Sequence, residues 1–246
     1  MKRLEGKVAL ITGASRGQGA AAARCFVAEG ARVVLGDVLD CAPLAHELGD
    51  AAVALTLDVT QESHWLAAVA LAETHFGALH VLLNNAGIVR VAPLLETSLD
   101  DYRAVIEVNQ TGCFLGMRVA APAMIRAGGG AIVNVSSVGG TRGMADAHAY
   151  AAAKAGVINL TRSLAKTYGP ENIRSNCFAP GVVDTGMIDP YREMFDQAFA
   201  DPVAAQQICP LGRMGTPEEA ADCMFFLAVA TYCNGSVLVM DGGSSA

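Results

Sequence analysis

Short apolar runs alternate along the chain with longer segments whose apolar residues recur at helical spacing. Within each run the apolar residues are consecutive rather than alternating, which is typical of strands covered on both faces. β-Branched residues are frequent in the runs and turn-forming residues end several of them, so we interpret them as strands. They are VALIT at 8–12, RVVLGD at 32–37, AVALTLD at 52–58, HVLLNNAG at 80–87, GGGAIVNVSS at 128–137, NIRSNCFAPG at 172–181 and the final SVLVMDGG.

Helical periodicity marks the segments between these strands, at 17–29, 41–48, 61–76, 98–127, 149–168 and 217–229. Strands that alternate with helices form a parallel sheet through right-handed crossovers. We therefore predict an α/β fold, a doubly wound (Rossmann-type) parallel sheet of about seven strands with helices on both faces. No linker or internal repeat is visible, so residues 1–246 are expected to form a single domain. Residues 187–208 are less regular.

Composition excludes several classes of protein. Of the 246 residues 52% are hydrophobic and 17% charged, and the formal net charge is −7. An acidic chain repels phosphate backbones, so no nucleic-acid partner is expected. The apolar runs are too short for a membrane span or a signal peptide, which predicts a cytoplasmic protein without a membrane partner. The seven cysteines form no CxxC pair, which favours buried free thiols over disulfides or a metal site.

A glycine-rich turn, TGASRGQG at 12–19, joins the first predicted strand to the first predicted helix. Backbone N–H groups at the start of a helix attract anions, so this turn is suited to a pyrophosphate. Glycine clusters also serve ordinary turns, but the position between strand and helix favours a dinucleotide site.

Asp37 ends the second predicted strand, about 20 residues after the glycine loop, where an acidic side chain accepts hydrogen bonds from the ribose of NAD. The alternative is an aspartate in a solvent-facing turn. Arg16, in the glycine loop, could instead pair with the additional phosphate of NADP. Because the carboxylate of Asp37 would occupy the place of that phosphate, we predict NAD as the cofactor and regard NADP as less favoured.

Tyr150 and Lys154 are four residues apart in a predicted helix and therefore share one face. A nearby ammonium, together with the positive nicotinamide of NAD⁺, favours the phenolate and lowers the pKa of a tyrosine from its usual value of about 10. Ser137, at a strand end, could hold a substrate oxygen while Tyr150 exchanges the proton. A Tyr-x-x-x-Lys pair alone usually lies on a surface; the serine and the glycine loop favour a catalytic interpretation.

With these residues in place, the whole chain resembles the short-chain dehydrogenase/reductase family, from LEGKVALITGASRGQG to VMDGG. The resemblance implies that the family's glycine motif, its adenine-binding aspartate and the residue after it, and its NNAG motif at 84–87 bind the cofactor. These residues are Gly13, Arg16, Gly17, Gln18, Gly19, Asp58, Val59, Asn85, Ala86 and Gly87.

The family's catalytic tetrad matches Asn109, Ser137, Tyr150 and Lys154. The resemblance implies that Asn109 bends a helix and holds a water linked to Lys154, and that Tyr150 and Lys154 also contact the nicotinamide ribose. It further implies that the family's PG motif meets the carboxamide and phosphates through Pro180, Gly181, Val183 and Thr185.

Three variable segments, 88–95, 138–148 and a lid at about 186–210, are where the family places its substrate contacts. The lid carries apolar side chains at near-helical spacing, which suit either a core or a cover that excludes water. We expect a hydrophobic secondary alcohol or ketone as substrate, with His148 at the pocket rim. Several stretches of the cofactor half, among them VVLGDVLD and FGALHVLLNNAGI, are similar to bacterial hydroxysteroid dehydrogenases of the 3α/20β type.

Two alternatives remain open. A 3-oxoacyl-carrier-protein reductase of the same family would use NADPH, with Arg126 and Arg142 as candidate contacts to an acidic carrier. A non-catalytic dinucleotide-binding protein would lack a tetrad residue, whereas all four are present.

The family also implies a homotetramer. Residues 232–235, Tyr-Cys-Asn-Gly, depart from the family's usual threonine before that glycine, which puts the local packing of the last strand in question.

Overall fold

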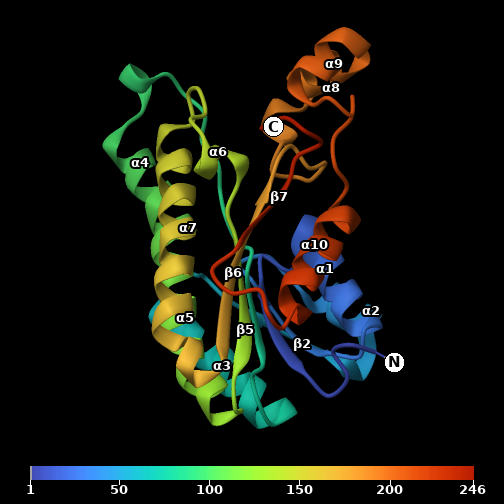
Figure 1. The fold of residues 1–246 in the computed structure, drawn as a ribbon, viewed down its shortest axis with the longest axis vertical. Coiled ribbons are helices and arrows are strands. Elements are labelled where there is room, and N and C mark those ends of the chain that lie inside the picture. Colours follow the sequence, from blue (N-terminus) through green and yellow to red (C-terminus); the bar gives the residue numbers. More distant parts are fainter. Residues whose placement is uncertain (1) are drawn as a thin grey trace.

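A wholly parallel sheet of seven strands forms the centre of the computed structural model, which describes residues 2–246 (Figure 1). The strand order is β3-β2-β1-β4-β5-β6-β7, so the chain first builds outward from β1 to β3 and then crosses over to β4. The strands are β1 Val8–Thr12, β2 Arg32–Asp37, β3 Ala52–Thr56, β4 Val81–Asn84, β5 Gly130–Val135, β6 Ile173–Pro180 and β7 Val237–Met240. This order reverses between β1 and β4, which is where ligands bind in open α/β sheets.

Helices cover both faces of the sheet, as the sequence predicted (Figure 1). One face carries α1 Gly17–Ala28, α2 Ala42–Leu48 and α10 Pro217–Val229. The other carries α3 Glu62–Phe76, α4 Leu99–Ile106, α5 Gly112–Arg126 and α7 His148–Tyr168. Across residues 2–246, no helix has both the length and the apolar character needed to span a membrane.

Burial on both faces explains the consecutive apolar runs. In β1, Ala9 and Ile11 pack into the core beneath α1 and α10, whereas Val8 and Leu10 pack into the core beneath α3 and α5. Successive side chains of a strand point to opposite faces, so each face of β1 needs its own apolar residues. Burying one such aliphatic side chain contributes about 1.5–3 kcal/mol, so continuous runs stabilise a doubly covered sheet.

The helix predicted over 98–127 is wrong in one respect, because a π-helical turn, Glu107–Thr111, separates α4 from α5. The side chain of Asn109 explains the change of winding. Its Nδ2 donates to the carbonyl oxygens of Val105 at 2.9 Å and Ile88 at 2.8 Å. An amide that competes for a helix carbonyl perturbs the regular i→i−4 ladder, and π-turns are common at functional sites.

The segment 187–208 is more regular than its sequence pattern suggested. It contains a 3₁₀ turn, Asp189–Tyr191, followed by α8 Arg192–Ala200 and α9 Pro202–Ile208. Proline stands near the start of both the 3₁₀ turn and α9, and the Asp201 side chain caps α9 by accepting from Val203 N–H at 2.9 Å. These helices extend beyond the sheet at the end where the chain leaves its strands (Figure 1). A four-residue helix, α6 Val138–Thr141, also follows β5, where we had predicted no element.

Candidate active site

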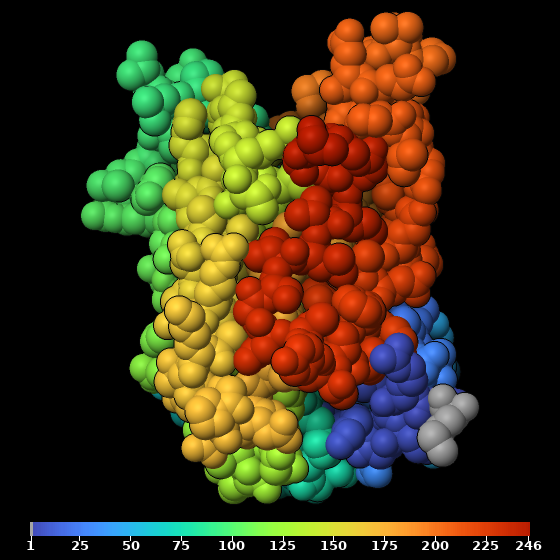
Figure 2. Space-filling model, viewed as in Figure 1, coloured from blue at the N-terminus to red at the C-terminus, as the bar shows by residue number. Residues whose placement is uncertain are grey.

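A pocket of about 540 Å³ lies at the carboxyl edge of the sheet. In the space-filling view, the molecule is notched at this end between the green to yellow-green side and the orange segment that includes α8 and α9 (Figure 2). Predicted site residues dominate the pocket wall, namely Gly13, Arg16, Gly17, Gln18, Asp37, Asp58, Val59, Asn85, Ala86, Gly87, Tyr150, Lys154, Pro180 and Thr185. The remaining predicted residues are not part of this wall, namely Gly19, Asn109, Ser137, Gly181 and Val183.

Hydrogen bonds tie the glycine loop to the NNAG segment. The hydroxyl oxygen of Thr12 accepts from the backbone N–H groups of Asn85 at 3.0 Å and Ala86 at 3.1 Å. The Asn85 side chain in turn donates to the Thr12 carbonyl at 2.9 Å. Gly13 has φ +64°, and a Cβ there would lie 2.8 Å from Nδ2 of Asn85. Only glycine therefore lets the two segments approach and form one rigid edge of the pocket.

The start of α1 is suited to a phosphate. Arg16 occupies the N-cap position but no side chain caps the helix, so the first N–H groups of α1 have no side-chain acceptor there. Gly17, at φ +56°, begins the helix in a left-handed conformation that favours glycine. Uncapped N–H groups and the positive end of the helix dipole together attract an anion. This cradle fits the pyrophosphate of a dinucleotide.

Asp37 is held by the glycine loop rather than free in solvent. One carboxylate oxygen accepts from the backbone N–H of Ser15 at 3.0 Å and from its hydroxyl at 2.7 Å, and the other accepts from Leu39 N–H at 3.1 Å. Arg16 points elsewhere, since its Nη1 would lie 2.7 Å from a Cβ placed on Gly186. The carboxylate is thus fixed on the pocket wall, while the guanidinium packs against the beginning of the lid.

Tyr150 and Lys154 are buried on the inner face of α7, at 9% and 3% exposure. The Nζ of Lys154 donates to the Val135 carbonyl at 2.8 Å and lies 5.5 Å from the centroid of the Tyr150 ring. Burial lowers the pKa of Lys154 to about 8. Burial also raises the pKa of Tyr150, and the Ser137 side chain opposes that rise. In the protein alone, burial therefore outweighs the expected effect of the ammonium on the phenol.

Ser137 and Asn109 lie just outside the pocket wall. Ser137 caps α6, its Oγ accepting from Gly139 N–H at 3.1 Å, so its own proton is not used by that bond. Asn109 is 2% exposed, and its Oδ1 has no hydrogen-bond partner among residues 2–246. A Cβ on Gly87 would lie 2.6 Å from this oxygen and 3.4 Å from Nζ of Lys154. Glycine at this position lets Asn109 and Lys154 approach each other.

Comparison with known proteins identifies the family of this chain. A family model described as Enoyl-(Acyl carrier protein) reductase matches residues 13–245. The chain belongs to the short-chain dehydrogenase/reductase family. It is 43% identical to a 3-alpha-(or 20-beta)-hydroxysteroid dehydrogenase of Mycobacterium tuberculosis, over 99% of this chain and 91% of that protein.

Two further relatives of this short-chain dehydrogenase/reductase act on different compounds by name. A trans-4-hydroxycyclohexanecarboxylate dehydrogenase of Sinomonas cyclohexanicum is 41% identical, over 99% of this chain and 95% of that protein. A 3-oxoacyl-acyl-carrier-protein reductase of Thermotoga maritima is 42% identical, over 98% of both chains. The chain is accordingly an oxidoreductase of alcohol and ketone groups, from a family that uses nicotinamide dinucleotides.

Sequence reasoning missed several residues of the pocket wall. Ser136 lines the pocket where Ser137 was expected, and its hydroxyl donates to the Lys154 carbonyl at 2.8 Å. The other missed wall residues are apolar: Val38, Leu39, Leu57, Val108 and Val135. Each of them lies within two positions of a predicted site residue, which is the one signal that could have found them. The remaining wall residues, Ile88, Val89, Gly186, Met187 and Pro190, lie in the segments 88–95 and 186–210, where substrate contacts were expected.

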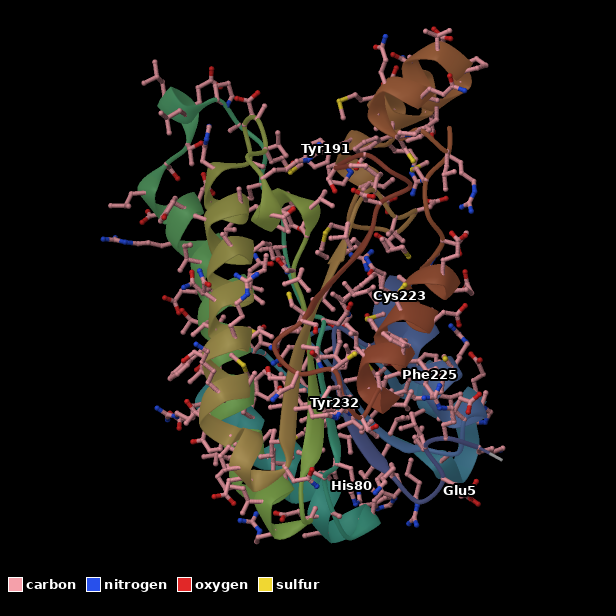
Figure 3. The ribbon with its side chains drawn as sticks, in the orientation of Figure 1. Glu5, His80, Tyr191, Cys223, Phe225 and Tyr232 are labelled. Atoms are coloured by element: carbon pink, nitrogen blue, oxygen red, sulfur yellow. The ribbon has the colours of Figure 1, made fainter. Side chains whose placement is uncertain are left out.

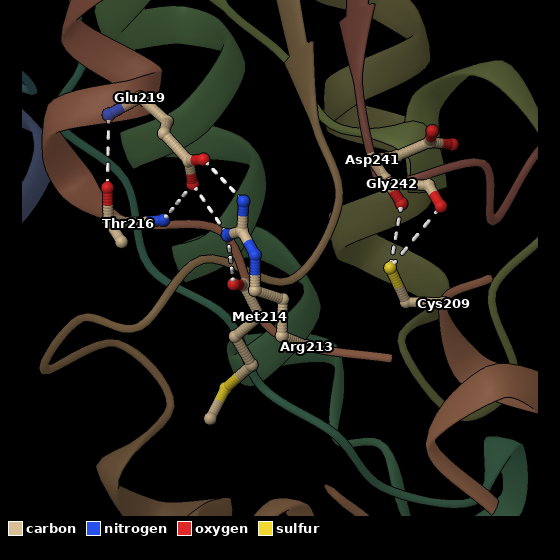
Figure 4. A network of polar contacts seen from close by, with 7 residues as sticks. All are labelled: Cys209, Arg213, Met214, Thr216, Glu219, Asp241 and Gly242. Carbon is tan, nitrogen blue, oxygen red and sulfur yellow. Dashed lines mark hydrogen bonds and ion pairs between the residues drawn. The ribbon is translucent and has the colours of Figure 1, made fainter. Parts of the chain in front are cut away.

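The C-terminal tail packs against the far end of the lid (Figure 4). The thiol of Cys209 lies 3.6 Å from the Asp241 carbonyl oxygen and 3.4 Å from that of Gly242. The backbone N–H of Gly181 donates to the Met240 carbonyl at 2.9 Å, which joins the PG motif to β7.

The departure from the family pattern at 232–235 is accommodated in the fold. The Asn234 side chain accepts from Ser175 N–H at 2.9 Å and donates to the Ala165 carbonyl at 3.1 Å.

Proposed function

We propose that the protein interconverts a hydrophobic secondary alcohol and its ketone with NAD(H), and that Tyr150 exchanges the proton with the substrate oxygen. The observation that supports this best is the shared wall of one pocket, which Tyr150 and Lys154 line together with the anion cradle and the fixed Asp37. When bound, the nicotinamide dinucleotide supplies or accepts the hydride. The protein's own residues place the substrate and move the proton.

Each tetrad residue has a role in this proposal. Tyr150 donates its phenolic proton to the carbonyl oxygen in reduction and takes it back in oxidation. The hydroxyl proton of Ser137, which the bond to Gly139 does not use, orients the same oxygen. Lys154 stabilises the phenolate by its charge, and the unpaired Oδ1 of Asn109 next to it is placed to hold a water in the path to solvent. The predicted cofactor residues of the wall, with the backbone of Gly181 and Val183, would hold the dinucleotide; Gly19 would let α1 pack closely on the loop.

The lid at 186–210 and the apolar wall favour a hydrophobic substrate. Ile88, Val89, Met187 and Pro190 face the pocket around Tyr150. Three curated relatives carry the names of a hydroxysteroid, a hydroxycyclohexanecarboxylate and a cyclohexanol dehydrogenase. We therefore propose an alicyclic alcohol or ketone, with the lid closing over it to exclude water.

The carrier-protein reductase alternative stays open. The guanidinium of Arg126 is bonded to the carboxylate of Glu73, and that of Arg142 to the carbonyl of Ser244. Both contacts are exposed and use only some of the five N–H donors of each guanidinium, so the cofactor preference is the property that separates the two functions. The homotetramer and the cytoplasmic location stay predictions.

We expect Asp37→Ala to exchange the cofactor preference. The variant loses charge-assisted hydrogen bonds to the ribose, which should lower kcat/KM for NADH about 100-fold. It also loses the repulsion between the Asp37 carboxylate and the additional phosphate of NADPH, which should raise kcat/KM for NADPH about 10-fold. Initial rates at 340 nm with a cyclic ketone and either cofactor measure both. Asp50→Ala, an equal charge change at an exposed site, serves as control. Faster turnover of NADPH by the unmodified protein would contradict the cofactor assignment, and no turnover of either cofactor would contradict the proposed function.

A further inference from the structure

A second cavity, of about 290 Å³, lies beside the active-site pocket. Three chain segments, 88–92, 148–150 and 190–191, line both the active-site pocket and the second cavity. Within each segment, some residues line the active-site pocket and the residues directly beside them line the second cavity. These are the three places where substrate contacts were expected, so the second cavity is a direct neighbour of the reacting centre.

Tyr191 connects the lid to the opposite wall of this cavity. It lies at the notched end of the molecule, where Figure 3 labels it between the lid and the side that carries α6 and α7. Its hydroxyl oxygen accepts from the backbone N–H of Val91 at 3.2 Å. That bond uses a lone pair and leaves the hydroxyl proton of Tyr191 to be donated to another acceptor.

His148 is the second polar group of the cavity wall. Its Nε2 is buried and has no hydrogen-bond partner among residues 2–246. A buried polar atom without a partner costs free energy, so we treat Nε2 as a candidate for a hydrogen bond to a bound molecule. His148 is the first residue of α7, and it lines the second cavity together with Ala149, whereas the next residue, Tyr150, lines the active-site pocket.

The rest of the wall limits the charge of what can bind. Arg90 forms an ion pair with Asp101, and both residues line the cavity, so their charges balance. The other side chains include the apolar Val91, Val105 and Ala149. An apolar body with one uncharged oxygen suits such a wall better than an anion or a cation does.

We propose that this cavity is a distal substrate subsite, in which His148 and Tyr191 bind a second oxygen, a hydroxyl or carbonyl, at the far end of an alicyclic substrate. This inference rests on the proposed function. It assigns the enzyme to substrates with two oxygen functions, one that reacts at Tyr150 and one that is only recognised. Specificity is then set by hydrogen bonds that an analogue without the distal oxygen leaves unmade.

Two matched pairs of ketones test the subsite. The short pair is 4-hydroxycyclohexanone and 4-methylcyclohexanone, and the long pair is 3-hydroxyandrostan-17-one and androstan-17-one. For at least one pair, kcat/KM with NADH should favour the hydroxylated ketone by about 10-fold or more, as expected for buried hydrogen bonds. The ratio is the useful quantity, because loss of the Tyr191–Val91 bond alters the lid for both members alike.

Tyr191→Phe and His148→Phe should each reduce this preference several-fold, and the double variant should bring it close to one. His148→Gln, which keeps a polar group near Nε2, should retain part of it, and Tyr102→Phe on the exposed side of α4 should leave it unchanged. Turnover without a preference in either pair, or with a preference that both variants keep, would overturn the subsite alone. No oxidation of NADH with any of the four ketones would overturn the proposed function and the subsite together.

Discussion

Replacement of Tyr150 by Phe is expected to lower kcat about 1,000-fold or more, because the variant keeps the ring but loses the phenolic proton that we assign to the substrate oxygen. Tyr150 is 9% exposed, so water has poor access to act as a substitute donor. The dissociation constant of NADH should change less than about threefold, since the phenol makes only one of many contacts in the proposed cofactor site.

Two measurements separate catalysis from binding in this variant. Rates with a cyclic ketone give kcat, and quenching of protein fluorescence by NADH gives the dissociation constant. Tyr168→Phe, at the other end of α7, removes the same hydroxyl away from the pocket and should retain full activity. Retained turnover in Tyr150→Phe would show that another group transfers the proton.

Replacement of Lys154 by Met is expected to lower kcat about 100-fold or more, because the buried ammonium no longer stabilises the phenolate of Tyr150.

The same variant should also change how the free energy of unfolding depends on pH. Burial lowers the pKa of Lys154 from 10.5 to about 8, so the cost of burying its charge is fully present below pH 8. Between about pH 8 and 10.5 the unfolded chain binds more protons than the folded one, and stability rises with pH.

The unmodified protein should therefore gain about 2–3 kcal/mol of unfolding free energy relative to Lys154→Met between pH 7 and pH 10. Urea unfolding of both proteins at the two pH values measures this difference. Lys166→Met, on the exposed side of the same helix, should show no such relative change. A difference that does not depend on pH would mean that Lys154 keeps an ordinary pKa in the folded protein.

The sequence was informative where one segment determines its own structure. The strand VALIT is buried on both faces, so its apolar run alone indicated a central strand. The glycine loop needs residues that adopt φ +64° and +56°, and glycine at positions 13 and 17 supplied that signal directly. The spacing of Tyr150 and Lys154 and the position of Ser137 indicated a catalytic group, to which the family motif added Asn109; Tyr150 and Lys154 do meet in one buried site.

Features that depend on contacts between distant segments were not predictable. The π-turn at Glu107–Thr111 depends on the bond from Asn109 to the Ile88 carbonyl, 21 residues away. Tyr191 lies in the lid at 186–210, where the sequence showed only apolar side chains at near-helical spacing. Its bond to Val91, 100 residues earlier, shows that it connects two walls of the second cavity. His148 was expected at the pocket rim, but that its Nε2 has no hydrogen-bond partner among residues 2–246 is a property of the folded surroundings, which the sequence did not indicate.

The most direct test of the central claim follows the hydride itself. The protein is incubated with a cyclic ketone and NADH carrying two deuterium atoms at C4 of the nicotinamide, and the alcohol formed is analysed by mass spectrometry. Our account predicts an alcohol with one deuterium on the carbinol carbon, formed by the unmodified protein and not by Tyr150→Phe. An alcohol without deuterium, or equal amounts from the two proteins, would contradict it.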